Sequence, residues 1–300
     1  MKLVDLHFQG YRGVIATAIL EGPSGIVLLD PGPSSTLHAL ESGLLSHGHR
    51  LEDVRSLLLT HIHLDHAGAS GTLASRLPAA RIYVHERGAP HMIDPTKLLQ
   101  SAARLYGDRM DRLWGAVQPV PADRLQVLSG GERLDLAGRT LHVAYTPGHA
   151  SHHVSYLDEG TGVAYVGDTA GVRRVRDYIV APTPPPDIDL DAWEQSLQAI
   201  ERWRPSSLFI THFGEIDDVT DHLRRFRSVL DTAARRVKAT LTQDGTDEDR
   251  MRRFRDDLRE EVRRVVSDDE ARSLELAAPF DQLWLGLARY WRKQAADGRR

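Results

Sequence analysis

The sequence predicts an α/β fold in which two β-rich halves pack as a sheet sandwich with helices on both outer faces. Apolar or alternating segments of strand length recur in residues 2–30, 124–168 and 206–214. Helix-periodic segments separate and follow these groups of strands. The chain has 300 residues, of which 41% are hydrophobic and 27% charged, so it can bury one large core.

The first half alternates strands and helices. LVDLHF, VIATAIL and GIVLLD predict three strands within residues 2–30, separated by glycines and a proline that favour turns. The loop DPGPSS can cap a helix over residues 36–47. The leucine run of residues 56–60 predicts a buried strand, and a helix over residues 67–77 and a strand over residues 81–85 follow.

The second half begins after a helical insertion over residues 94–117. Alternating stretches in residues 124–148 predict β-hairpins, and residues 152–168 predict two more strands. Residues 187–203 have helical spacing, and residues 206–214 predict a last strand.

The chain therefore divides into a main domain of residues 1–214 and a C-terminal helical extension of residues 215–300. The extension is charged and helix-periodic, but it carries too many apolar side chains for free-standing helices. We expect these side chains to dock on the sandwich or on a second copy of the chain, which would give a homodimer. They are Leu223, Phe226, Leu230, Phe254, Trp284, Leu285 and Trp291.

Composition and charge limit the classes of function that the chain can have. The chain has 38 basic and 42 acidic residues and a net charge of −4, so we expect no nucleic-acid partner. It has no long uncharged apolar stretch for a membrane span, and Asp5 and His7 lie where a signal peptide would be apolar. We therefore predict a cytoplasmic protein that acts on a small molecule. The absence of cysteine leaves only His, Asp and Glu as metal ligands.

Polar side chains gather where the leucine strand ends. His61, His63, Asp65 and His66 occur within six positions, directly after Thr60. His61 and His63 point the same way if the chain stays extended past the strand. Four ligands from one loop fit two metal ions, about 3.5–4 Å apart, better than one ion. Completing such a pair requires further His or Asp residues from other strand ends.

Three other strand ends supply such residues. His149 follows an apolar strand and a Pro-Gly turn in YTPGHASHH. Asp168 lies in YVGDTAG and His212 lies in LFITHFG. Each segment places a ligand-type residue beside or near a glycine at the end of an apolar strand. This repeated arrangement predicts a site assembled from several strand ends.

The ordered motifs HxHxDH, TPGH, GDT and THFG, over residues 2–214, resemble those of the metallo-β-lactamase superfamily of binuclear hydrolases. The HxHxDH pattern is similar to that of the glyoxalase II-like and lactonase-like members. The resemblance implies an αββα sandwich with the metal ions at one edge. By position, it implies that the first ion is held by His61, His63 and His149, the second by Asp65, His66 and His212, and both by Asp168.

The resemblance also implies supporting residues. Asp30, in LLDPG, would support the metal-binding loop from behind, and His153 would form hydrogen bonds rather than ligate. The chain lacks the cysteine ligand of the antibiotic-degrading members and the glutamate of the oxygen-reducing diiron members. Ala170 and Gly171 follow GDT, where glutathione-thioester hydrolases usually have an apolar-aromatic pair.

Two divalent metal ions are the implied cofactors. Zinc is the expected metal for a histidine-rich site, and iron or manganese also suits a bridging aspartate. Two ions that share a water lower its pKa from 15.7 to about 7, which supplies a bridging hydroxide at neutral pH. The predicted activity is hydrolysis of a carboxylic ester, lactone or thioester, with Asp65 orienting the nucleophile. Tyr178 is a candidate to polarise a substrate carbonyl, and core packing is its alternative role.

Two other functions stay open. A phosphodiesterase of the same fold would need a basic channel, whereas the sequence shows only scattered arginines. A non-catalytic, metal-stabilised binding or regulatory module would keep the metal ligands but would turn over no substrate. Open metal positions favour chemistry over this last function.

Overall fold

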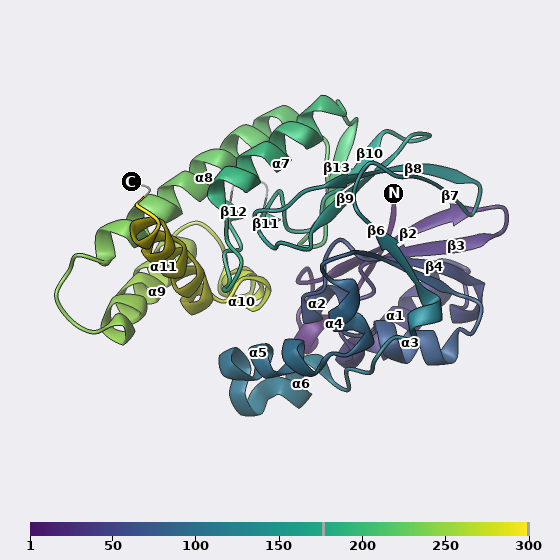
Figure 1. The fold of residues 1–300 in the computed structure, drawn as a ribbon, viewed down its shortest axis with the longest axis horizontal. Helices are drawn as coiled ribbons and strands as arrows, with labels where there is room; N and C mark the ends of the chain where they lie inside the picture. Colours follow the sequence, from purple (N-terminus) through teal and green to yellow (C-terminus); the bar gives the residue numbers. More distant parts are fainter. Residues whose placement is uncertain (176–177, 299–300) are drawn as a thin grey trace.

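The computed structural model describes residues 1–175 and 178–298, and these residues form four layers. Two six-stranded sheets pack face to face, and helices cover the outer face of each sheet (Figure 1). The expected αββα sandwich is therefore confirmed. The two sheets are called sheet A and sheet B below.

Sheet A comes from the first half of the chain. Its strands follow the chain order β1 (Lys2–Asp5), β2 (Ala16–Gly22), β3 (Gly25–Leu29), β4 (Val54–Leu58), β5 (Arg81–His85) and β6 (Leu125–Leu128). The β1–β2 and β2–β3 pairs are antiparallel. The pairs from β3 to β6 are parallel, with Leu28 opposite Leu57 and Leu57 opposite Ile82. Parallel neighbours require crossover connections, and here these connections contain helices.

Sheet B comes from the second half. Its strands lie in the order β14 (Gly214–Ile216), β13 (Ser207–Ile210), β10 (Val163–Tyr165), β9 (Val154–Asp158), β8 (Arg139–Tyr145) and β7 (Arg133–Leu136). All neighbours are antiparallel except β10 and β13, which are parallel. The long helix α7 (Leu190–Arg202) lies between β10 and β13 in the sequence.

The alternation of side chains along β3 explains the packing of the sheets. Val27 and Leu29 lie in a buried cluster between the sheets, together with Tyr156 of sheet B. Ile26 and Leu28 belong to another buried cluster, between sheet A and its helices. Successive side chains of a strand point to opposite faces, so one apolar strand supplies two cores.

Helices complete the outer layers (Figure 1). Sheet A is covered by α1 (Leu37–Ser46), α2 (Leu64–Ala67), α3 (Ser70–Arg76) and α4 (Ala89–Ile93). Helices α5 (Thr96–Tyr106) and α6 (Met110–Trp114) pack beside this layer. Sheet B is covered by α7 and α8 (Val219–Thr240), whose Trp193 and Phe226 share a buried cluster with Leu208 of β13. Short 3-10 helices join these elements: η1 (Phe8–Gly10), η2 (Ser34–Thr36), η3 (Leu51–Asp53), η4 (Gly107–Arg109) and η5 (Ala122–Arg124).

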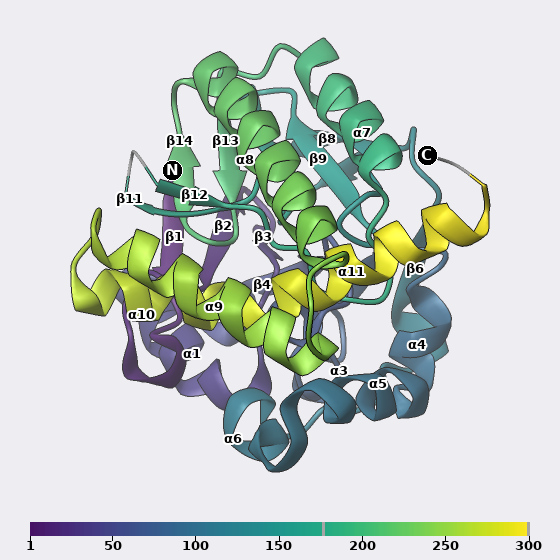
Figure 2. The same cartoon turned by 90° about the vertical axis from the view of Figure 1, so that its left-hand side faces the viewer.

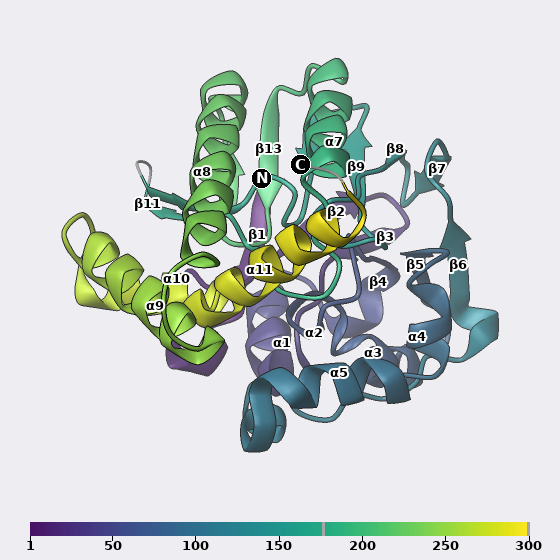
Figure 3. The ribbon, with the colours of Figure 1, turned by 60° about the vertical axis from the view of Figure 1, so that its left-hand side comes forward.

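The last three helices dock on the same chain. They are α9 (Asp247–Arg263), α10 (Asp268–Ala277) and α11 (Phe280–Ala296). Their buried Phe254 and Trp284 join the cluster outside sheet B, and Trp284 Nε1 donates to Thr240 Oγ1 at 2.8 Å. Figures 2 and 3 show α11 lying between α8 and the α4–α6 region. The domain boundary at residue 214 and the homodimer stay predictions.

Several short elements differ from the sequence-based expectation. β6 is not part of a hairpin but pairs in parallel with β5 at the edge of sheet A, because an alternating pattern does not encode its partner. β14 follows the strand that was expected to be the last, and β11 (Val172–Val175) and β12 (Tyr178–Val180) form a separate small hairpin. The short strands β11, β12 and β14 lie outside the longer apolar runs that predicted the other strands. No helix in the described ranges has the length and low polarity that a bilayer crossing requires.

Candidate metal centre

The expected metal ligands come together where four strands of the sandwich end. β4, β8, β10 and β13 all finish at one edge, and each is followed within two to eight residues by one or more of these side chains. All of them are buried except His63 and Asp65, which are partly exposed. The assembled residues are His61, His63, Asp65, His66, His149, Asp168 and His212.

The first donor group consists of three histidines. His61 Nε2 lies 2.9 Å from His63 Nδ1, and His149 Nε2 lies 3.0 Å from the same atom. All three ring nitrogens lie within 4.8 Å of one another. Three convergent imidazole nitrogens are a common zinc-type donor set.

The second donor group consists of Asp65, His66 and His212. The two Nε2 atoms of His66 and His212 face each other at 3.2 Å, and His212 Nε2 lies 3.4 Å from Asp65 Oδ2. Their donor atoms also lie within 4.8 Å of one another.

Asp168 lies between the two groups. Its Oδ2 is 3.3 Å from His149 Nε2, and its Oδ1 is 3.3 Å from His66 Nε2. The buried Oδ1 has no hydrogen-bond partner within the described residues. Burial raises the pKa of Asp168, but His66, His212 and His149 outweigh it and hold the pKa well below its usual value. An ionised, unpartnered oxygen between two nitrogen groups fits a cation that is shared by both.

Three of the histidine rings are held in place by hydrogen bonds from the Nδ1 atom, which faces away from the centre. His66 Nδ1 contacts Asp30 Oδ2 at 2.8 Å, His149 Nδ1 contacts the Pro182 carbonyl at 2.8 Å, and His212 Nδ1 contacts the Val14 carbonyl at 2.6 Å. An oxygen acceptor requires a proton on Nδ1, so the Nε2 lone pair of each ring faces the centre. Two such lone pairs 3.2 Å apart repel each other unless a proton or a cation lies between them. The residues present therefore fit a metal site.

Asp30 links the ends of β4 and β13 through hydrogen bonds, on the side of the donor groups that faces the protein interior. It is fully buried, with 0% exposure, and accepts hydrogen bonds at 2.8 Å from Thr60 N, Thr60 Oγ1 and Thr211 Oγ1. Thr60 and Thr211 immediately precede His61 and His212. Asp30 also binds a ring nitrogen of the second donor group, so one carboxylate positions parts of both groups.

Two glycines allow the chain to pass close to neighbouring groups. A Cβ on Gly148, at φ +133°, would lie 2.4 Å from the backbone of Trp193. A Cβ on Gly167, at φ +47°, would lie 2.5 Å from Thr60 Oγ1. The next residues, His149 and Asp168, reach the centre only because these positions carry no side chain.

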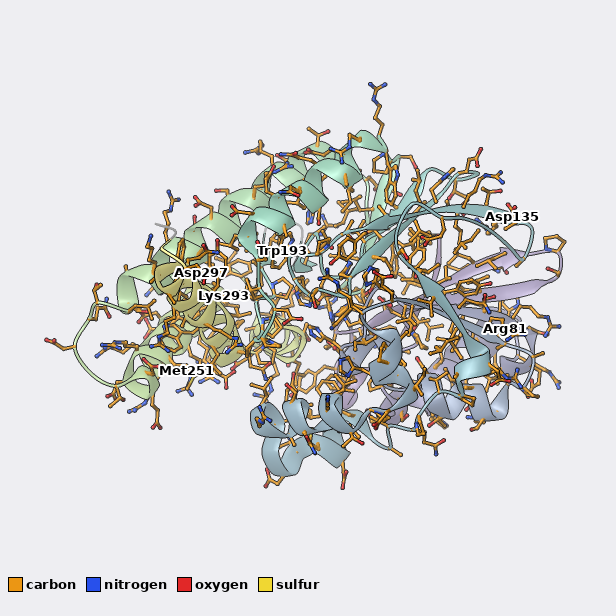
Figure 4. All side chains as sticks on the ribbon, viewed as in Figure 1. Arg81, Asp135, Trp193, Met251, Lys293 and Asp297 are labelled. Carbon is orange, nitrogen blue, oxygen red and sulfur yellow. The ribbon has the colours of Figure 1, made fainter. Side chains whose placement is uncertain are left out.

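Trp193 and His153 support the same segment. Trp193 lies on α7 (Figure 4), and its Nε1 donates to the Thr169 carbonyl at 2.7 Å. Its ring meets the His149 ring edge-on, with 5.7 Å between centroids. His153 Nδ1 lies 3.0 Å from Thr146 Oγ1, and its Nε2 accepts from Asp168 N at 3.4 Å. His153 thus forms hydrogen bonds beside the centre.

Burial lowers the pKa of the histidines in the first group. Burial, followed by the charges of His66 and His63, holds the pKa of His61 well below its ordinary value. Burial and His149 lower the pKa of His63 to about 4. Burial also lowers the pKa of His149, although Asp168 opposes this shift. These rings are neutral near pH 7 and offer lone pairs to a cation.

In the second group, nearby carboxylates raise the pKa of the two histidines. Burial lowers the pKa of His66, but Asp168 and Asp30 outweigh it and hold the pKa well above its ordinary value. The pKa of His212 is also raised, because Asp168 and Asp65 outweigh burial. The local field therefore favours positive charge at this point, whether a proton or a metal cation.

A cavity of about 330 Å³ opens over the centre. His63, Asp65, His149 and Asp168 lie at its floor. Its walls come from three separate parts of the chain and are largely apolar: α5 and α6 in the insertion, the proline loop over residues 182–186, and α11. The insertion over residues 94–117 thus contributes a wall of this cavity.

Some cavity residues have no local signal in the sequence. Tyr106 on α5 donates a 3.2 Å hydrogen bond to Gln282 on α11, and both residues line the cavity. Arg87 and Lys97 lie at its rim. Only the fold brings Tyr106 and Gln282 together, and nothing in the neighbouring sequence marks either of them. His152, three residues after His149, also lines the cavity.

The structure does not bring Tyr178 to the centre. Tyr178 is partly buried in β12, packs against the hydrophobic cluster outside sheet B and does not line the cavity. Burial raises its pKa to about 12, with Glu261 and Arg236 as the charged neighbours. The β11–β12 hairpin carries this side chain toward the C-terminal helices.

Residues 10–212 match the family model of the metallo-beta-lactamase superfamily. A metallo-beta-lactamase fold-containing protein of Sulfurisphaera tokodaii is 28% identical over 220 residues, which cover 71% of this chain and 79% of that protein. A hydroxyacylglutathione hydrolase of Aeromonas hydrophila is 31% identical over 123 residues, but the match covers only 40% of this chain and 36% of that enzyme.

Solved structures agree on the fold over nearly the whole chain. An archaeal metallo-beta-lactamase superfamily protein from Sulfolobus tokodaii has a TM-score of 0.67 at 20% identity, covering 95% of this chain and 96% of its own. A metallo-beta-lactamase family protein from Thermus thermophilus has a TM-score of 0.67 at 24% identity, covering 94% and 89%. The C-terminal helices therefore belong to a fold that is found in other proteins.

Proposed function

The chain belongs to the metallo-beta-lactamase superfamily of metal-dependent hydrolases, and from this premise we propose that it hydrolyses a carboxylic ester, lactone or thioester at a binuclear metal centre. The observation that carries the proposal is the pair of donor groups that share Asp168 at the floor of a 330 Å³ cavity. A pocket of this size accepts a small organic substrate.

We assign His61, His63 and His149 to the first ion, and Asp65, His66 and His212 to the second, with Asp168 shared. The ions would supply Lewis acidity and bring the pKa of a bound water down to about 7. Zinc is the proposed metal because the donor set is rich in histidine, and iron or manganese is the alternative.

Asp65 is the proposed catalytic carboxylate. Its side chain is 20% exposed and lines the cavity, so it can reach both a water and a substrate. Burial raises its pKa, but His66 and His212 outweigh burial and lower the pKa to about 2, so the group is ionised at neutral pH. We propose that this carboxylate orients the attacking water, accepts its proton and returns the proton to the leaving atom.

The walls of the cavity support an acyl substrate. Leu64, Leu98, Trp114 and Leu283 give an apolar lining beside the donor groups, which suits the hydrocarbon part of an ester or thioester. The partial match to hydroxyacylglutathione hydrolases also favours a thioester. A cytoplasmic location stays a proposal, supported by a cysteine-free composition that suits a reducing compartment.

A substrate panel tests the proposal. Purified protein of measured metal content would be assayed with p-nitrophenyl butyrate, a lactone, an acyl thioester and bis-p-nitrophenyl phosphate. We expect turnover of at least one acyl substrate, and a loss of at least about 100-fold in His61→Ala or Asp65→Ala with an unchanged circular dichroism spectrum. An active His61→Ala protein would contradict the assignment. Cleavage of the phosphodiester alone would support a phosphodiesterase, and two bound metals without any turnover would support a binding module.

A further inference from the structure

A second cavity, of about 440 Å³, lies between the insertion and the C-terminal helices. Its walls come from η1, from the η4–α6 segment, and from α9 and α10. Figure 2 shows α6 below α9. Asp65, Tyr106 and Trp114 line this cavity and also the cavity over the candidate metal centre. The two cavities therefore meet beside Asp65.

The second cavity is basic, although the chain as a whole has a net charge of −4. Its lining includes five arginines and three carboxylates, which leaves an excess of two positive charges. The arginines are Arg109, Arg112, Arg255, Arg259 and Arg272. They come from two regions that are more than 140 residues apart in the sequence, so only the fold makes them neighbours.

Some of these arginines are neutralised within the protein and others are not. Arg259 Nε lies 3.0 Å from both carboxylate oxygens of Glu275, and Arg255 Nε lies 2.9 Å from Asp256 Oδ1. In residues 1–175 and 178–298, the guanidinium groups of Arg112 and Arg272 have no hydrogen bond or ion pair, and Gln9 Nε2 donates only to the Arg112 carbonyl. These two arginines come from α6 and α10, on different walls of the cavity.

We propose that the second cavity binds a phosphate-bearing leaving group of the substrate while the acyl part occupies the apolar cavity. This inference rests on the proposed hydrolase function and names the substrate class as an acyl ester or thioester with a phosphorylated leaving group. Guanidinium groups bind phosphate oxygens through paired, charge-assisted hydrogen bonds. The scissile carbonyl would lie beside Asp65, where the cavities meet. The substrate would therefore span both cavities.

Calorimetric titration with pyrophosphate tests the site without turnover. The test variant is Arg112→Gln/Arg272→Gln, and the matched control is Arg104→Gln/Arg202→Gln, which removes the same charge from exposed positions outside the cavity. We expect the test variant to bind pyrophosphate about tenfold more weakly and the control to match the wild type. Binding by the wild type should also weaken as NaCl is raised.

Two further titrations separate phosphate recognition from metal binding and from general attraction of anions. His63→Ala, which removes a proposed metal ligand, should keep its affinity for pyrophosphate, because this variant leaves all five arginines in place. Citrate should bind more weakly than pyrophosphate if phosphate is the preferred anion. Equal binding of pyrophosphate by the wild type and the test variant, or tighter binding of citrate, would overturn the proposal.

Substrate kinetics link the site to hydrolysis. An acyl-coenzyme A thioester carries phosphates on its leaving group, and the N-acetylcysteamine thioester of the same acyl group carries none. We expect wild-type kcat/KM to favour the charged thioester by at least about tenfold and the test variant to lose this preference. The rate with the neutral thioester should not change.

Equal use of both thioesters by the wild type would overturn the inference and leave the hydrolase function intact. Pyrophosphate binding that depends on the arginines, without turnover of any acyl substrate, would instead support the anion site and refute the hydrolase function.

Discussion

At the scale of single residues, the hydrogen bonds of each histidine ring decide which of its two nitrogens is free to bind a metal ion. His149 and His212 donate Nδ1 hydrogens to backbone carbonyls, and His66 donates to Asp30. Their Nε2 atoms consequently face the centre. The sequence identified the donor residues correctly as neighbours, but only the fold shows which nitrogen of each ring is available.

Asp30→Asn should weaken metal binding. Asp30 Oδ2 accepts from Thr60, His66 and Thr211, and an amide offers fewer acceptor sites than a carboxylate. We expect metal affinity to fall by about 10–100-fold, as is typical when a partner of a ligand is lost. Competition with a metal-binding dye measures this change. Asp135→Asn, at a 68% exposed position on β7 (Figure 4), is the control and should have no effect.

His222 should make the protein sensitive to acid. Burial lowers the pKa of His222 to about 4, although its hydrogen bond to the Ala170 carbonyl opposes the shift. The unfolded chain takes up this proton first as pH falls below 6.5, so the folded state loses stability between pH 6.5 and 4. We expect about 2 kcal/mol less stability from this residue at pH 5 than at pH 7.

Urea unfolding at pH 7 and pH 5 measures the contribution of His222. Burial also lowers the pKa of several other histidines, so the informative quantity is the difference between the wild type and His222→Gln. Glutamine keeps a donor for the Ala170 carbonyl and does not titrate. An identical loss of stability in both proteins would contradict the prediction.

At the scale of elements, the C-terminal helix α11 forms part of a cavity wall. Gly286 allows α11 to lie directly against the proline loop, since a Cβ there would come within 2.0 Å of the Thr183 carbonyl oxygen. Thr183 Oγ1 also donates to the Leu283 carbonyl at 3.1 Å. The position of the cavity wall therefore depends on one close contact between a helix and a loop.

Gly286→Ala should destabilise the protein despite the better helix propensity of alanine. The propensity gain is about 1 kcal/mol, whereas a clash with backbone in a packed interface costs about 1–3 kcal/mol or more. We expect Tm to fall by several degrees in differential scanning calorimetry. Lys293→Ala, at an exposed position on the same helix, should leave Tm nearly unchanged. An unchanged Tm in Gly286→Ala would show that the loop can move away without cost.

At the scale of the whole molecule, the centre joins the two halves of the sandwich. The first donor group combines His61 and His63, which follow sheet A, with His149, which follows β8 of sheet B. The second group likewise combines His66 with His212, which follows β13. A bound metal would therefore link both sheets at one edge.

Metal removal should lower the stability of the entire fold. A ligand that binds only the folded state adds about 4 kcal/mol when its concentration is about 1,000 times its Kd. We expect a chelator to reduce Tm and added zinc to restore it. A His61→Ala/His212→Ala variant, which loses a proposed ligand from each group, should show a much smaller response to either treatment. The same Tm with and without metal in the wild type would contradict the proposed centre.

The sequence predicted the sandwich, and the proximity of the seven His and Asp side chains, because both follow from local patterns. The leucine run before His61 reads as a buried strand, and the glycines before His149 and Asp168 mark sharp turns at strand ends. The partner of β6 and the existence of β14 were not predicted. Their partners are set by packing across the sheet, which three or four residues do not encode.

By itself, the sequence determined which possible donor side chains are present, that cysteine is not among them, and that they follow apolar strands. The tertiary structure decided what surrounds that centre. Tyr106 and Gln282, 176 residues apart, meet through one hydrogen bond, and arginines that are scattered along the chain line one cavity beside Asp65. Periodicity and motifs record contacts within a segment, whereas a cavity forms between segments whose docking depends on long-range packing.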